Sequence, residues 1–322
     1  MAVPISLLVD DCAPVNTMFW HDPPGDHPFA MPNSLARDFA DLCAAHGVRG
    51  KFSVLPMPCC LGGIDSRLAH VPPRVLDGFL DIVRAKIVPR FDITPEILTH
   101  SNAYKLTGGF RHVYEDEWIA GATVKEITDY IALALRMLDY VGLPANGVTS
   151  PWNTGQHNEP QYAQAIGAAQ WRVHRRRVTW YFLHMIGRGP GRWPWVSWRN
   201  PKTRQAVVSI PSTTDDPFWN TQRPASASRR AARAAAAAGA DAMLTADGRK
   251  GRIRELLGQP CPILLLTHWQ SLYSDGTRTG LWGLERLLDR IEKRLGSEVE
   301  WTTCSELAAR AVKAPHASAS GV

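Results

Sequence analysis

The sequence predicts an α/β fold, most simply a distorted (β/α)7 barrel of mainly parallel strands. Short apolar runs alternate with amphipathic segments about seven times along the 322 residues, a pattern typical of parallel strands connected by helices. The apolar runs are short and nearly continuous, as expected for strands covered on both faces. Neither a G-x-G-x-x-G motif nor a P-loop follows the first strand, which favours a barrel over an open nucleotide-binding sheet.

The first half of the chain supplies four of the expected strands. A helix is expected with Asn33 or Ser34 as its N-cap and Gly47 as its C-terminal stop. A longer helix is expected from about Val124 to Val141, with Gly142 after it. The remaining expected elements are strands at 4–9, 50–55, 90–94 and 147–150 and a helix at 73–87.

The second half is less regular but continues the alternation. Pro262 to Thr267 is the most convincing buried strand, because it is an unbroken apolar run. Other expected elements are strands at 178–183, 206–210 and 299–301, helices at 159–170 and 281–295, and two helices within 225–257 broken near 248. We expect one barrel domain over residues 1–313 and a disordered tail over 314–322, whose residues are small and polar.

Composition limits the classes of protein to which the chain can belong. With 45% hydrophobic and 20% charged residues, it is an ordinary globular chain that can bury a large core. The net charge of +6 is compatible with an acidic carbohydrate but does not indicate a nucleic-acid partner. The basic run Arg172–Arg177 is either a solvated face or a patch for an anionic ligand.

The compartment follows from cysteine usage and from the apolar segments. Six cysteines occur without a C-x-x-C pair, which indicates a reducing environment. No apolar stretch approaches the roughly 20 residues of a membrane span, and the N-terminal segment lacks the features of a signal peptide. We therefore expect a cytoplasmic protein without a membrane partner; its oligomeric state is left open.

Polar side chains follow nearly every expected strand. In α/β barrels the catalytic groups lie at these carboxyl ends. Asp10 and Asp11 end the first strand, and His184 and His268 end two later ones. Other polar residues at strand ends lie within 96–102, 149–153 and 211–216.

This residue set predicts a metal-assisted hydrolase. A divalent ion bound by a carboxylate and imidazoles lowers the pKa of a bound water to about 7. Asp10 and Asp11 alternate in direction along a strand, yet at a frayed strand end both can reach one pocket. One can then bind the metal while its neighbour acts as general base, and the cation relieves the repulsion between them.

Three segments resemble motifs of the polysaccharide deacetylase (NodB-homology) family, and their order along residues 5–268 also agrees. They are LLVDDC at 7–12, EILTHS at 96–101 and LLTH at 265–268. Gly50–Val54 is also similar to the second strand of that family, and Ser150-Pro151-Trp152 is weakly similar to its Arg-x-Pro motif. The resemblance implies that Asp10 is the catalytic base, Asp11 and His100 are metal ligands, and His268 is the catalytic histidine. It also implies a divalent cofactor: zinc first, with manganese, cobalt and nickel as alternatives.

The sequence departs from that family at several positions. Cys12 replaces a glycine, and the arginine of the Arg-x-Pro motif is absent. Tyr104 stands where the second metal histidine is expected. Asn102, Tyr104 itself or His184 is therefore the candidate third ligand, with His268 as a further possibility.

Aromatic residues point to a carbohydrate substrate. The chain has twelve tryptophans, and flat rings can stack on the apolar faces of sugars, although they also pack cores and lids. The residues expected to contact the substrate are Trp152, Asn153, Asp215, Trp219 and Trp269.

Three functional hypotheses remain. The first is a metal-dependent carbohydrate deacetylase. The second is a glycoside hydrolase on the same barrel, in which two carboxylates flank the bond; a mannosidase-like version would use Asp11 and His268 as metal ligands and Asp215 or Asp216 as the attacking acid. The third is a non-catalytic relative that binds a glycan or a partner. Release of acetate or of free sugar separates the first two.

Overall fold

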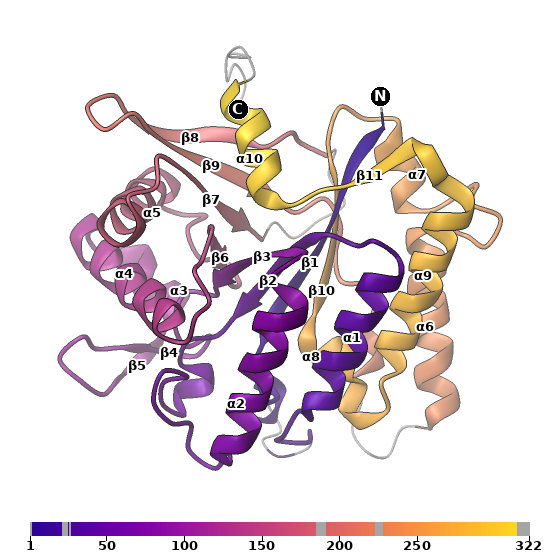
Figure 1. Cartoon of the computed structure of the whole chain (residues 1–322), viewed down its shortest axis with the longest axis horizontal. Helices are drawn as coiled ribbons and strands as arrows, with labels where there is room; N and C mark the ends of the chain where they lie inside the picture. Colours follow the sequence, from indigo (N-terminus) through magenta and orange to yellow (C-terminus); the bar gives the residue numbers. More distant parts are fainter. Residues whose placement is uncertain (1, 21–24, 26, 185–190, 223–227, 314–322) are drawn as a thin grey trace.

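The computed structural model describes residues 2–20, 25, 27–184, 191–222 and 228–313, and the expected tail at 314–322 lies outside these residues. The described chain has an α/β architecture with mainly parallel strands, in agreement with the prediction (Figure 1). Among its helices, none combines the length and apolar character that crossing a lipid bilayer requires.

The strands form two main sheets and one small hairpin. The first sheet has the order β10-β1-β2-β3, all parallel, with β11 also parallel to β1. Its strands are β1 (Val3–Cys12), β2 (Gly50–Val54), β3 (Phe91–Pro95), β10 (Ile263–His268) and β11 (Val299–Trp301). The second sheet has the order β6-β7-β9-β8, in which only β8 is antiparallel. Its strands are β6 (Val148–Ser150), β7 (Val178–Leu183), β8 (Trp195–Asn200) and β9 (Gln205–Pro211), and the hairpin is β4 (Asn102–Tyr104) with β5 (Phe110–Tyr114).

Two links join the sheets, but the expected closed barrel is not shown. An isolated parallel bridge pairs Glu96, just after β3, with Thr149 of β6. On the other side, Thr213 and Thr214 reach β10 with their side chains, which accept hydrogen bonds from the amides of Leu264 (2.8 Å) and Leu266 (3.0 Å). The carboxyl ends of both groups of parallel strands are thereby held around one region.

Helices cover the outer faces of the strands. Figure 1 shows α3, α4 and α5 on one side, α6 and α9 on the opposite side, and α1 and α2 in front of β1–β3. The helices are α1 (Asn33–Ala45), α2 (Pro73–Ile82), α3 (Glu115–Gly121), α4 (Val124–Tyr140), α5 (Glu159–His174), α6 (Arg229–Met243), α7 (Arg252–Leu257), α8 (Trp269–Tyr273), α9 (Thr279–Leu295) and α10 (Cys304–Lys313). The hairpin β4–β5, strand β8 and helices α3, α8 and α10 were not expected from the sequence.

Local sequence explains where the helices begin. Thr123 and Glu126 form a reciprocal capping box that starts α4 at Val124. The expectation for α1 was wrong in one detail: Pro32 is the N-cap, and the side chain of Asn33 donates a hydrogen bond to the Val75 carbonyl instead. Gly47 has a φ of 64°, which suits its expected role just after α1.

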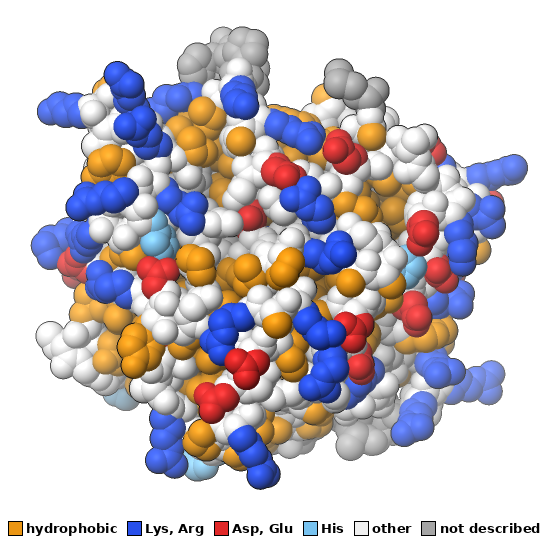
Figure 2. Space-filling model, in the orientation of Figure 1, with side chains coloured by type: hydrophobic (Ala, Val, Ile, Leu, Met, Phe, Trp, Pro, Cys, Tyr) orange, Lys and Arg blue, Asp and Glu red, His pale blue; other side chains and the backbone are white. Residues whose placement is uncertain are grey.

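The basic run at the end of α5 has acidic neighbours. Arg172 lies 2.5 Å from an oxygen of Asp129, and His174 lies 2.8 Å from Asp139. Figure 2 shows Lys and Arg side chains spread over the face of the molecule that is in view, with acidic side chains interspersed among them. These ion pairs favour the solvated-face interpretation of residues 172–177.

Candidate functional site

A pocket of about 490 Å³ lies where the carboxyl ends of β1, β10 and β7 meet the loops after β3 and β9. This volume is within the range of small-molecule sites. Nine residues predicted from the sequence line the pocket: Asp10, Asp11, His100, Trp152, His184, Asp215, Asp216, Trp219 and His268. The structure therefore gathers into one cavity side chains that are up to 258 positions apart along the chain (10 to 268).

The two adjacent acids reach the same pocket because the backbone turns between them. Asp11 has a left-handed φ of 64°, and the pairing register with β2 shifts between Val9 and Cys12. Such an irregularity reorients side chains at a strand end. Strand alternation would otherwise send Asp10 and Asp11 to opposite faces, so this local distortion makes a shared pocket feasible.

Beneath the pocket, Lys51 of β2 balances the charge of Asp10. The Lys51 side chain is fully buried, and its ammonium group donates hydrogen bonds to Asp10 and to Thr149 (2.9 Å). It also lies 4.7 Å from the centre of the Phe182 ring. Asp10 is only 3% exposed but still lines the pocket. A lysine inside the buried strand Gly50–Val54 was the sequence signal that could have revealed this partner.

Asp11, Glu96 and His100 form a metal-competent cluster. Each offers one ligand atom, and these atoms lie within 4.8 Å of one another. The Asp11 Oδ1 atom is 2.7 Å from His100 Nε2. Glu96 Oε2 accepts hydrogen bonds from the Asp11 amide (2.6 Å) and from the Ser53 hydroxyl (2.5 Å). Two carboxylates and an imidazole thus converge from β1 and from the loop after β3.

This donor set fits a divalent cation. Carboxylate oxygen and imidazole nitrogen are common ligands of zinc, and imidazole also suits cobalt and nickel, whereas carboxylate suits manganese. Within the described residues, Asp11 Oδ1 is buried and makes no hydrogen bond beyond its ion pair with His100. Three acids, Asp10, Asp11 and Glu96, lie close together, and a bound cation would offset their mutual repulsion.

Charge interactions within the cluster shift the pKa values of its two carboxyl groups in opposite directions. Burial and the nearby charges of Asp11 and Asp10 raise the pKa of Glu96 to about 8. Burial also acts to raise the pKa of Asp11, but the charge and hydrogen bond of His100 outweigh it and lower that pKa. Burial alone would lower the pKa of His100, yet Asp11 raises it to about 9. The proton on His100 balances the charge of Asp11, so a cation that bound here would have to compete with that proton.

A second histidine–carboxylate pair, His268 with Asp216, lines the same pocket. His268, at the end of β10, is the register neighbour of Asp10 on β1. Its Nδ1 atom is 2.9 Å from Asp216 Oδ2, and the same oxygen accepts a hydrogen bond from the His268 amide (3.0 Å). Burial alone would lower the pKa of His268, but Asp216 raises it to about 9. His268 is thereby held protonated and in a fixed orientation at neutral pH.

Four residues predicted to act in the site do not line the pocket: Asn102, Tyr104, Asn153 and Trp269. Asn102 and Tyr104 belong to β4 and do not line the pocket; the Tyr104 ring packs on Phe110 instead. Glu96 takes the third position in the cluster, and its place at the start of the EILTHS motif was the available signal. Asn153 is exposed and is also absent from the pocket lining.

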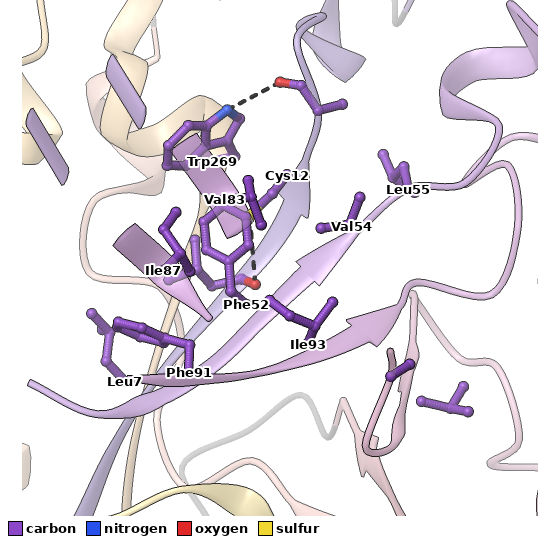
Figure 3. Packing of buried hydrophobic residues seen from close by; sticks show 14 of the residues in the cluster. Leu7, Cys12, Phe52, Val54, Leu55, Val83, Ile87, Phe91, Ile93 and Trp269 are labelled. Atoms are coloured by element: carbon purple, nitrogen blue, oxygen red, sulfur yellow. Dashed lines mark hydrogen bonds between the residues drawn. The ribbon is translucent and has the colours of Figure 1, made fainter. Parts of the chain in front are cut away.

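Trp269 is a core residue rather than a substrate contact. It is 1% exposed, and its indole N–H donates to the Ala13 carbonyl (3.1 Å). Its ring packs edge-on against Phe39 and Phe52, and Figure 3 shows it among the buried apolar side chains of the hydrophobic core. The residue after His268 begins helix α8, which turns its side chain inward.

Two tryptophans do flank the pocket. The Trp152 ring centre is 4.1 Å from that of His100, on the side of the metal-competent cluster. The Trp219 ring centre is 5.0 Å from that of His268, and this residue is 43% exposed. His184 lies between β7 and the pocket, 6.3 Å from the His268 ring centre, and is not part of the three-residue cluster. Burial lowers its pKa.

Comparisons with known proteins give distant likeness in structure alone. No protein-family model matches the chain, and no curated protein sequence matches it. Among solved structures, the fold is similar to the crystal structure of a mutant of a CE4 family pseudoenzyme, with a TM-score of 0.44 and 10% identity over 95% of this chain and 67% of that one. At this distance the likeness assigns neither a family nor an activity to the chain.

Proposed function

We propose that the protein is a metal-dependent hydrolase that removes an acyl group from a carbohydrate. One observation carries the proposal: a metal-competent cluster, a protonated histidine and Asp10 all line one pocket. Hydrolysis of an amide or ester needs a polarised carbonyl, a base for the water and an acid for the leaving group. This arrangement supports all three.

Each residue has a distinct role in the proposed reaction. A divalent ion held by Asp11, Glu96 and His100 would supply Lewis-acid activation of the water and of the acyl carbonyl. Asp10, which forms a buried ion pair with Lys51, accepts the proton of the attacking water. His268, kept protonated by Asp216, donates a proton to the departing nitrogen or oxygen. The register pairing of Asp10 with His268 supports base and acid acting on the same bond.

The lining of the pocket supports a carbohydrate as substrate. Trp152 and Trp219 place aromatic rings beside the two histidines, where a sugar ring could stack while its acyl group faces the cluster. Asp215 also lines the pocket and is exposed, so it is available to sugar hydroxyl groups. The net charge of +6 is compatible with an acidic saccharide.

The test measures bound metal and released product together. Protein stripped with a chelator is reloaded with zinc, manganese, cobalt or nickel, and acetate and free sugar are assayed on a panel of acetylated saccharides. Asp11→Asn and His100→Ala should lose the metal, whereas Asp10→Asn should keep it and lose activity. Asp215→Asn, in the same pocket, is the matched control that should retain the metal.

Three outcomes would overturn the proposal in different ways. Wild-type protein that retains no ion, with a chelator leaving its activity unchanged, would exclude the metal. Release of free sugar without acetate would favour the glycoside hydrolase. Saccharide binding with neither product would favour the non-catalytic alternative.

A further inference from the structure

Glu115, the first residue of α3, lies outside the pocket but binds the backbone of the loop that carries His100. Its side chain is fully buried, and both carboxylate oxygens are used. Oε2 accepts a hydrogen bond from the His100 amide (2.7 Å), and Oε1 accepts one from the Thr99 amide (2.8 Å). The Tyr130 hydroxyl, from α4, donates to Oε1 as well (2.6 Å).

The loop that Glu115 holds has an unusual backbone. Ile97 and His100 both have left-handed conformations, with φ of 44° and 48°. For residues other than glycine such conformations are unfavourable, and they persist only when the surroundings enforce them. The amides of Thr99 and His100 point towards one buried carboxylate, and without an acceptor both would be buried and unsatisfied.

The His100 ring lacks the usual support of a metal-binding histidine. Such a residue nearly always donates its second ring N–H to a carboxylate, carbonyl or water, which fixes the ring. Within the described part of the chain, His100 Nδ1 is buried and has no hydrogen-bond partner. The ring is therefore oriented by other means: the adjacent Trp152 ring, 4.1 Å away centre to centre, and the backbone from which it projects.

We propose that Glu115 is the positioning residue that sets the affinity of the Asp11–Glu96–His100 cluster for a divalent cation, by fixing the backbone of His100. This inference rests on the proposed metal-dependent function. Glu115 acts through the main chain, so it fills the role that a partner of Nδ1 has in other metal sites. Tyr130 holds Glu115 in turn, and its hydroxyl accepts a hydrogen bond from the Tyr104 amide (2.9 Å), which ties β4 to the same network.

Glu115→Gln is the decisive variant because it keeps the shape of the side chain. A glutamine offers one acceptor oxygen to the three donors that now share the carboxylate, and its amide group would face another donor. Asp92→Asn is the matched control. Asp92 is also a buried carboxylate, and it accepts hydrogen bonds from the Ser305 amide (2.6 Å) and the Asn146 side chain (2.9 Å), away from the pocket.

The experiment measures zinc affinity by competition with a chromophoric chelator, with the free energy of unfolding measured in parallel. Glu115→Gln should weaken zinc binding by about 10- to 100-fold, the usual effect of losing an outer partner of a metal ligand. Asp92→Asn should lower stability but leave zinc affinity within about twofold. An isotope-edited NMR spectrum should show the ring resonances of His100 shifted in Glu115→Gln and unchanged in Asp92→Asn.

The outcomes separate this inference from the proposed function. If wild-type protein binds zinc and Glu115→Gln binds it equally well, the positioning role is wrong and the metal site stands. Equal weakening in both variants would also overturn the positioning role, because it would reflect general destabilisation. Wild-type protein that binds no zinc would overturn the metal site and this inference with it. Should Glu115→Gln fail to fold, Tyr130→Phe decides, because it removes one donor to Glu115 and should weaken zinc binding severalfold.

Discussion

Two histidine–carboxylate pairs line the pocket, and they use different ring nitrogens. His100 presents Nε2 to Asp11, leaves Nδ1 without a hydrogen bond and is held through its backbone by Glu115. His268 presents Nδ1 to Asp216, which also holds its backbone amide. In the first pair the carboxylate shares the side of the ring that would face a cation. In the second the carboxylate lies behind the ring, which leaves Nε2 for proton transfer.

The largest expected effect comes from breaking the buried ion pair between Lys51 and Asp10. Lys51→Met should lower the free energy of unfolding by about 3–5 kcal/mol, because it leaves the charge of Asp10 buried without its partner. The double variant Asp10→Asn with Lys51→Met should recover part of this loss. Chemical denaturation measures all three proteins.

Lys86 offers the matched control for that loss. Its ion pair with Asp41 has a separation of 2.6 Å, but both side chains are about half exposed. Lys86→Met should therefore change stability by less than about 1 kcal/mol. Equal effects of the two substitutions would show that the Lys51 ion pair is not desolvated as described.

The next effect distinguishes the two histidines by their response to metal. Zinc at 100 times its dissociation constant should stabilise the wild type by about 2.7 kcal/mol. This gain should vanish in His100→Ala, which removes a ligand, and persist in His268→Ala, which does not. Thermal unfolding with and without zinc provides the measurement, and loss of the gain in both variants would mean that His268 is a ligand.

A smaller effect concerns only His268 and its partner Asp216. Asp216→Asn should lower the pKa of His268 from about 9 towards 6.5, because the hydrogen bond and charge that oppose burial are lost. In the wild type, protonated His268 stabilises the fold fully below pH 6.5, and this contribution disappears as the pH rises through about 9. NMR titration of the His268 ring in metal-free protein reports the shift. An unchanged titration would rule out Asp216 as its cause.

The smallest effect on stability concerns the exposed aromatic ring beside His268. Trp219→Ala should change the free energy of unfolding by about 0.5 kcal/mol or less but weaken saccharide binding. Trp269→Ala should destabilise by about 3–5 kcal/mol, because it leaves a cavity beside Phe39 and Phe52. Saccharide affinity that is unchanged in Trp219→Ala would remove this residue from the substrate site.

The strands and the strand-end residues could be predicted because they follow from local patterns. Buried parallel strands read as short apolar runs, and motifs such as LLVDDC and LLTH mark where those runs end. Asp10, Asp11, His100 and His268 therefore meet in one pocket, as their positions at strand ends suggested. The α/β class follows from the same alternation of apolar and helical segments.

The partners of these residues were not predicted, because assigning them depends on contacts distant in sequence. The pairing of Lys51 with Asp10 requires the register of β2 against β1. Glu96 joins the cluster because the pairing of β3 with β2 places its carboxylate where it accepts a hydrogen bond from the Asp11 amide. Trp269 was misplaced because helix α8 begins at that residue and reverses the direction of its side chain.

The central position of β1 has a consequence for synthesis of the protein. Ile5 of β1 pairs with Ile263 of β10, and ribosomes add roughly 5–20 residues per second. The edge of β1 that pairs with β10 therefore remains without its neighbouring strand for roughly 10–50 s after β1 has been made. Asp11, Glu96 and His100 can come together early on the nascent chain, whereas His268 can join them only after β10 has been made. Chaperone dependence should accordingly be greatest in that interval, when an aggregation-prone edge is exposed.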